Sequence, residues 1–140
     1  MTERVVIVEG VRTPIGRFGG TLKNVSSGFL AAHVITALLN KTGIHPEQVE
    51  EVILGEVRQT TESSNVARVA AIRANIPVEV PAFTINRLCA SGMQAIASGV
   101  QQIQSGQAQI VIEGGTEGMS NAPLYVRSSR FGEGDPYLAV

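Results

Sequence analysis

Apolar runs alternate with helical repeats of apolar positions along the first 120 residues of the chain. Residues 5–8 form an unbroken β-branched run, and further segments with an apolar centre lie at residues 51–57, 82–86 and 109–113. A strand that is apolar without alternation is typical of a parallel sheet that is covered on both faces. These runs therefore predict four strands.

Three helical stretches fall between the predicted strands. The first begins at Ser26 or Ser27 and ends near Gly43, the second covers residues 66–74, and the third runs from about Ser91 to Ser105. Serine begins helices by accepting backbone hydrogen bonds, and glycine ends them. In the third stretch, small residues surround the apolar stripe, which predicts a helix buried between layers with Met93 in the core.

The order of these elements is β-α-β-α-β-α-β, with connections long enough for parallel pairing. The predicted fold class is therefore α/β, a layered and mostly parallel sheet in one domain over residues 1–120. Residues 121–140 follow no helix or strand pattern and are predicted to be irregular. Ligands of such sheets bind at the carboxyl ends of the strands.

Composition and charge exclude several classes of function. The 140-residue chain has a net charge of -1, so it has no general attraction to nucleic acid or to an anionic membrane surface. His33 and His45 have no further ligand at metal-binding spacing, so no metal site is predicted. The glycine-rich residues 10–20 match neither the dinucleotide fingerprint nor the P-loop. One cysteine and no signal-peptide pattern favour a cytoplasmic or organellar-matrix protein, and a cytoplasmic location is the prediction.

Cys89 is the candidate catalytic residue, because it stands where the third strand ends and the third helix begins. At such a corner the first helical N–H groups are unpaired, and the positive end of the helix dipole favours a thiolate over a thiol. Ala90, Ser91 and Gly92 are small enough to let a carbonyl group approach, and Ser91 is predicted to cap the helix. The alternative is a buried cysteine that acts as a small hydrophobic residue.

Three segments resemble the thiolases, specifically the acetyl-CoA acetyltransferase type. The sequence VRTPIG at residues 11–16, followed by FGG, is similar to the first loop of that family. The sequence NRLCASGMQA at residues 86–95 resembles its nucleophile signature. The sequence GGTEGMS at residues 114–120, with Pro123, resembles the loop after its fourth strand.

The resemblance implies that Cys89 accepts an acyl group from acyl-CoA, and that a second acetyl-CoA attacks the resulting thioester. The reverse reaction cleaves 3-oxoacyl-CoA. It implies coenzyme A thioesters as substrates and no tightly bound cofactor; the coenzyme-binding residues are unknown. A homodimer or tetramer is expected of the full-length enzyme, with a candidate interface at Phe83, Thr84, Ile85, Asn86 and Arg87.

The chain also departs from the family. Thiolases have two similarly folded halves, and the second supplies a histidine and another cysteine that this sequence lacks. The resemblance thus implies that the chain is most of a thiolase N-terminal half and lacks the last strand of that half. It also implies that residues 121–140 begin the CoA-binding loop and that the chain is inactive alone. Two alternatives stay open: a β-ketoacyl-synthase-like condensing enzyme, which shares the fold and a nucleophilic cysteine, and a non-catalytic α/β interaction module.

Overall fold

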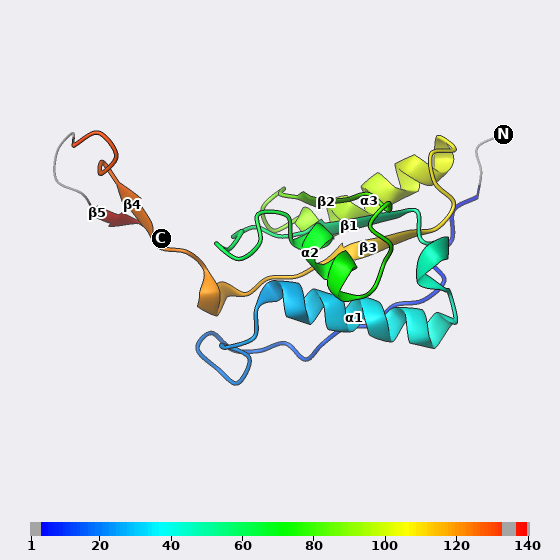
Figure 1. The fold of residues 1–140 in the computed structure, drawn as a ribbon, viewed down its shortest axis with the longest axis horizontal. Helices are drawn as coiled ribbons and strands as arrows, with labels where there is room; N and C mark the ends of the chain where they lie inside the picture. The colour runs from blue at the N-terminus through cyan, green and yellow to red at the C-terminus, as the bar shows by residue number, and fades with distance from the viewer. Residues whose placement is uncertain (1–3, 133–136, 140) are drawn as a thin grey trace.

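A parallel sheet lies at the centre of the fold, as the sequence predicts. The computed structural model describes residues 4–132 and 137–139. The sheet has the order β2-β1-β3, in which β1 (Glu51–Gly55) pairs in parallel with both β2 (Ala82–Ile85) and β3 (Val111–Gly115). Figure 1 shows the helix α3 (Ser91–Gln104) on one side of this sheet and the helix α1 (Ser27–Thr42) on the other. The α/β class is confirmed.

Local signals set the ends of the helices on the α1 side of the sheet. The hydroxyl of Ser26 accepts a hydrogen bond from the Phe29 N–H at the start of α1, and Gly43 ends the helix with φ of 71°. The helix α2 (Val66–Arg73) begins after Asn65, whose side chain accepts from the Arg68 N–H. The predicted beginnings of both helices are therefore confirmed.

The core lies between the sheet and the two helices α1 and α2. Leu54 of β1 and Ile112 of β3 are buried in one cluster with Ile35 and Leu39 of α1. The cluster is completed on α2 by four small or β-branched residues that let this helix come close to the strands: Val66, Ala67, Ala70 and Ala71.

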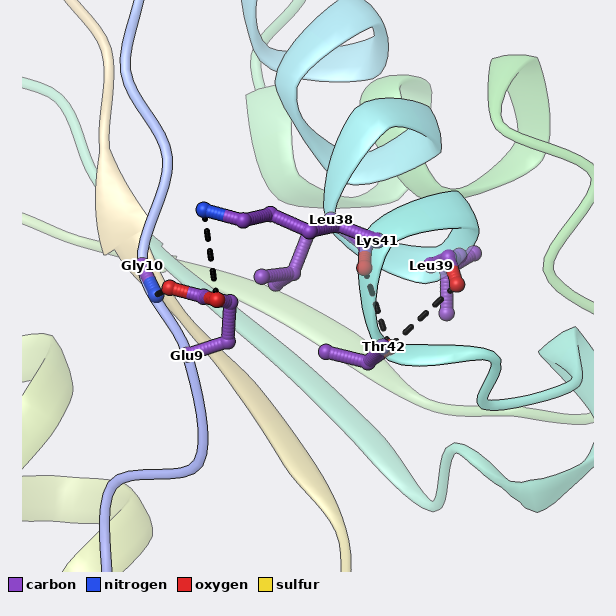
Figure 2. A network of polar contacts seen from close by, with 6 residues as sticks. All are labelled: Glu9, Gly10, Leu38, Leu39, Lys41 and Thr42. Atoms are coloured by element: carbon purple, nitrogen blue, oxygen red, sulfur yellow. Dashed lines mark hydrogen bonds and ion pairs between the residues drawn. The ribbon is translucent and has the colours of Figure 1, made fainter.

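The predicted strand at residues 5–8 is wrong. Residues 4–17 have no regular secondary structure, and the side chains of Val6, Ile7 and Val8 are 65%, 81% and 73% exposed. A strand is stabilised by a hydrogen-bonded neighbour, and no strand in the described part of the chain pairs with this segment. An ion pair of 3.2 Å between Glu9 and Lys41 ties it to the last turn of α1 instead (Figure 2).

A groove of 440 Å³ separates this N-terminal segment from the sheet. Its walls are residues 9–18, the helix α1 and the edge of β3. Leu30, Val34 and Leu38, which share one face of α1, line the groove and are only partly buried.

The prediction that the third helix is buried between layers, with Met93 in the core, is also wrong. The residues of α3 that are buried are Ser91, Ala95 and Gly99. Met93 is 76% exposed and Ile96 is 40% exposed. The physical reason is that the small residues allow the closest approach to the sheet, which turns the large apolar side chains outward.

The last described residues form a hairpin, so the irregular structure predicted for residues 121–140 is wrong in part. After a 3₁₀ turn at Met119–Asn121, β4 (Tyr125–Arg127) pairs antiparallel with β5 (Tyr137–Ala139). Figure 1 shows this hairpin standing away from the central sheet. The division of the chain at residue 120 stays a prediction.

One short element remains before β1. A 3₁₀ turn, Pro46–Gln48, precedes β1. Within residues 4–132 and 137–139 no helix is long and apolar enough to cross a membrane.

Glu113 is an acidic residue placed inside the contact between β3 and α3. A Cβ built at Gly99 of α3 would collide with the Glu113 carboxylate, so the missing side chain of Gly99 provides the space for it. Burial raises the pKa of the Glu113 carboxyl from 4.5 to about 7. The neutral acid is therefore the form that this contact favours.

The variant Glu113→Gln tests this placement. Because the folded-state pKa of Glu113 is raised, its contribution to stability is fully present below pH 4.5 and is lost as the pH rises to about 7. In urea unfolding, the free energy of unfolding of the glutamine variant relative to the wild type should rise by roughly 1–2 kcal/mol across that interval. This value allows for partial screening of the carboxylate by solvent. A difference that stays constant with pH would contradict the placement.

Candidate active site

Cys89 lies at a sharp corner between β2 and α3, as the sequence predicts. The strand ends at Ile85, the helix begins at Ser91, and Ala90 is the residue that precedes the first helical turn. Leu88 has φ of 50°, a left-handed conformation that residues other than glycine rarely adopt. The Cys89 side chain is exposed, which excludes the alternative of a buried hydrophobic cysteine.

Ser91 stabilises the corner but does not cap the helix, so the prediction of a cap is wrong. Ser91 is already the first helical residue and is buried, while Ala90 at the cap position has no side chain that could accept a hydrogen bond. The Ser91 hydroxyl accepts from the Arg87 N–H at 2.8 Å and donates to the Leu88 carbonyl at 2.6 Å. It therefore bridges the two peptides that lead into Cys89.

Glycines allow the start of α3 to lie directly on the ends of the strands. A Cβ built at Gly55, the last residue of β1, would stand 2.5 Å from the carbonyl carbon of Ser91 and 2.6 Å from the Gly92 nitrogen. A Cβ at Gly115 would be 3.5 Å from the Gly92 Cα. The position of the Cys89 corner over the sheet thus depends on backbone contacts that a side chain would prevent.

The loop at residues 114–120 reaches the same end of the sheet as Cys89. The strands that precede Cys89 and this loop are not neighbours, because β1 lies between β2 and β3. The loop instead contacts β1: the Thr116 N–H donates to the Gly55 carbonyl at 3.0 Å, and the Glu117 carboxylate accepts from the N–H groups of Val57 at 2.8 Å and Arg58 at 3.2 Å.

One buried acidic residue beneath this loop, Glu56, was not identified from the sequence. Glu56, 1% exposed, accepts a hydrogen bond of 2.5 Å from the Ser27 hydroxyl, and its second carboxylate oxygen has no partner among the described residues. Burial raises the pKa of Glu56, as does the negative charge of Glu117, while the bond from Ser27 lowers it. The sequence signal that could have identified Glu56 is its position directly after the buried strand β1.

The glycine-rich residues 10–20 join this region from the other side of the groove. The Gly19 N–H donates to the Ser120 hydroxyl at 2.9 Å, so the first loop and the loop after β3 are connected. In the part of the chain that the structure describes, no cluster of three histidine, cysteine or acidic side chains could hold a metal ion. No described side chain forms a hydrogen bond with the Cys89 sulfur.

Comparison with known proteins decides the family of this fold. A family model described as "Thiolase, N-terminal domain" matches residues 5–135. The chain belongs to the thiolase family. The corner that carries Cys89, the glycines beneath it and the loop held by Glu117 all lie inside the matched thiolase domain.

Relatives of known name are thiolase-family acyltransferases. The chain is 48% identical over 132 residues to an acetyl-CoA acetyltransferase of Syntrophomonas wolfei, and 44% identical over 129 residues to a probable acetyl-CoA acyltransferase of Staphylococcus aureus. These matches cover 94% and 92% of this chain but 33% of each relative. The chain therefore spans about a third of the length of these relatives.

A solved thiolase structure has the same fold. The acetyl-CoA acetyltransferase of Bacillus anthracis superimposes with a TM-score of 0.91 and 44% sequence identity, over 96% of this chain and 35% of that one. The resemblance predicted from the three sequence segments is confirmed at the level of family and fold.

The close approach at Gly55 is tested by the variant Gly55→Ala. The added methyl group would meet backbone atoms of Ser91 and Gly92, which cannot move without displacing the start of α3. We expect a loss of about 1–3 kcal/mol in the free energy of unfolding in urea. Gly10→Ala is the matched control, because nothing lies within 4 Å of the position that its added methyl group would occupy. Equal stability of the two variants would contradict the close approach.

Proposed function

We propose that Cys89 is the acyl-accepting nucleophile of a thiolase-type acyltransferase that acts on coenzyme A thioesters. The observation that carries the proposal is the exposed Cys89 at the strand-to-helix corner, within the matched thiolase domain. The names of the relatives, which refer to acetyl-CoA acetyl- or acyltransferases, support the substrate class.

The chemistry follows from the properties of a thiolate and a thioester. The Cys89 thiolate adds to the carbonyl carbon of acyl-CoA, the tetrahedral intermediate collapses, and the thiolate of coenzyme A leaves and takes up a proton. In the second step, the α-carbanion of acetyl-CoA adds to the acyl-cysteine, and the Cys89 thiolate is released together with 3-oxoacyl-CoA. Thiolysis is the same sequence in reverse. The backbone N–H of Cys89 contributes to binding the oxyanion of the intermediate.

The 140-residue chain is proposed to accept an acyl group without completing the reaction. A carbanion forms only when a base removes the α-proton, and the Cys89 sulfur has no hydrogen-bonded side chain among the described residues. The chain also spans about a third of its relatives. A cytoplasmic location stays a prediction.

Acetylation of the chain tests the proposed nucleophile. Incubation with acetyl-CoA should give one acetyl group that peptide mass spectrometry places on Cys89 and hydroxylamine removes, whereas Cys89→Ala and the urea-unfolded chain should stay unlabelled. The same sample should show no CoA-dependent thiolysis of acetoacetyl-CoA. Absence of label on the folded chain would contradict a nucleophilic role and favour the interaction module, and sustained thiolysis would contradict the proposed inactivity.

The outer edge of β2 is the proposed dimer interface, comprising Phe83, Thr84, Ile85, Asn86 and Arg87. Support comes from the strand order, in which β2 lies at an edge and pairs only with β1 among the described strands. The carbonyls of Pro81 and Ile85 bond to β1, so the alternation of a parallel ladder turns the peptide N–H of Thr84 away from β1. The Ala82 carbonyl on this edge already accepts from the Asn65 side chain, so a second copy can add its backbone hydrogen bond at the Thr84 N–H.

Hydrogen exchange tests this interface. If chains associate through β2, sedimentation velocity will show a dimer at high concentration, and the Thr84 amide will exchange more slowly as the dimer forms. The Val52 amide, bonded inside the sheet, serves as an internal reference because its protection does not depend on association. A dimer in which Thr84 exchange is independent of concentration would place the interface elsewhere.

A further inference from the structure

The peptide between Val57 and Arg58 is held from both sides by side chains of other segments. On one side, the Glu117 carboxylate accepts the N–H of this peptide, that of Arg58, at 3.2 Å, and the preceding N–H of Val57 at 2.8 Å. On the other, the Asn86 side-chain amide donates to the Val57 carbonyl at 3.0 Å. One peptide just after β1 therefore connects the loop that follows β3 with the segment that leads into the nucleophile corner.

Asn86 continues this connection to Leu88. Its side-chain oxygen accepts the Leu88 N–H at 3.0 Å, so a single amide group bonds to both Val57 and Leu88. Leu88 has φ of 50°, a conformation that costs about 1–2 kcal/mol for a residue other than glycine. Such a backbone conformation persists only when the surroundings hold it.

We propose that Asn86 is a positioning residue for Cys89, which acts by fixing the left-handed conformation of Leu88 against Val57. Glu117 supports Asn86 by holding the same peptide, that between Val57 and Arg58, through the Arg58 N–H. The inference rests on the proposed nucleophilic role of Cys89 and assigns the residues that set the direction of its thiol.

The exposure of Asn86 separates this role from a general contribution to stability. Asn86 is at the surface, where the net contribution of a hydrogen bond to the free energy of folding is small. Loss of its two hydrogen bonds should therefore change the corner more than it changes the fold.

Asn65, whose side chain also bonds to β2, provides a matched control. Its side chain also makes a local and a long-range bond, to the Arg68 N–H at 3.2 Å and to the Ala82 carbonyl at 3.0 Å, and it accepts from the Thr84 hydroxyl at 2.9 Å. None of these bonds involves a residue of the corner. Asn65→Ala should lower the stability without altering Cys89.

The experiment compares Asn86→Ala, Glu117→Gln and Asn65→Ala in the full chain. The first readout is nuclear magnetic resonance of the backbone, in which the amide shifts and the HN–Hα coupling of Leu88 report its conformation. The second is the rate of Cys89 alkylation by iodoacetamide over a range of pH, divided by the rate of the same chain unfolded in urea. This alkylation ratio measures how much the folded corner increases the reactivity of Cys89 over that of an ordinary thiol.

Asn86→Ala should shift the Leu88 and Cys89 resonances and lower the alkylation ratio about tenfold, because misdirection of a reacting group has effects of this order or larger. Glu117→Gln should give a smaller change of the same sign, since one acceptor oxygen remains. Asn65→Ala should change neither readout. Unchanged Leu88 and Cys89 resonances in Asn86→Ala, or equal changes in Asn65→Ala, would overturn the inference.

The same data separate this inference from the proposed function. If the wild-type ratio is close to one while Asn86→Ala still displaces the corner resonances, the nucleophilic role of Cys89 fails and Asn86 retains its positioning role. If the wild-type ratio is high and Asn86→Ala leaves it high, the nucleophile stands and the positioning role of Asn86 fails.

Discussion

The contact between the end of β1 and the start of α3 is the constraint on which the candidate site depends. Gly55 meets Ser91 and Gly92 at distances that leave no room for a Cβ, and Gly115 approaches the same point from β3. Backbone packed on backbone tolerates little displacement. The corner that presents Cys89 is therefore located by the sheet, although Cys89 itself is exposed.

Polar side chains then connect the segments that surround this contact. Ser91 bonds to the Arg87 N–H and the Leu88 carbonyl, and Glu117 and Asn86 hold the peptide between Val57 and Arg58 from its two sides. Beneath them, the Ser27 hydroxyl at the start of α1 bonds to the buried Glu56. The segments that follow the three strands of the sheet and the beginning of α1 are thus joined by side chains, because their backbones belong to no common ladder.

Two of the apolar groups that the sequence assigns to the core lie outside it in the described chain. Val6, Ile7 and Val8 are exposed beside the groove along β3, and Met93 and Ile96 are exposed on the outer side of α3. The sequence assigns both groups to the interior because β-branched runs and helical stripes are typical of buried elements. An apolar side chain is buried only when another element of the structure covers it. A periodic pattern in the sequence shows which residues are apolar but does not show whether such an element is present.

The sequence alone determined those features whose cause lies within a few residues. Ser26, Asn65 and Gly43 define helix ends through bonds and backbone angles next to them, and Cys89 is placed at a corner because a strand pattern stops just before it. The motif around it also identifies the thiolase family. Only the tertiary structure decided the strand order, the exposure of residues 6–8 and the partners of Glu56, Glu117 and Asn86. The bonds from Ser27 to Glu56, from Asn86 to Val57 and from Val57 to Glu117 join residues 29 to 60 positions apart. The approach of such distant segments is set by the packing of the whole sheet and not by local preference.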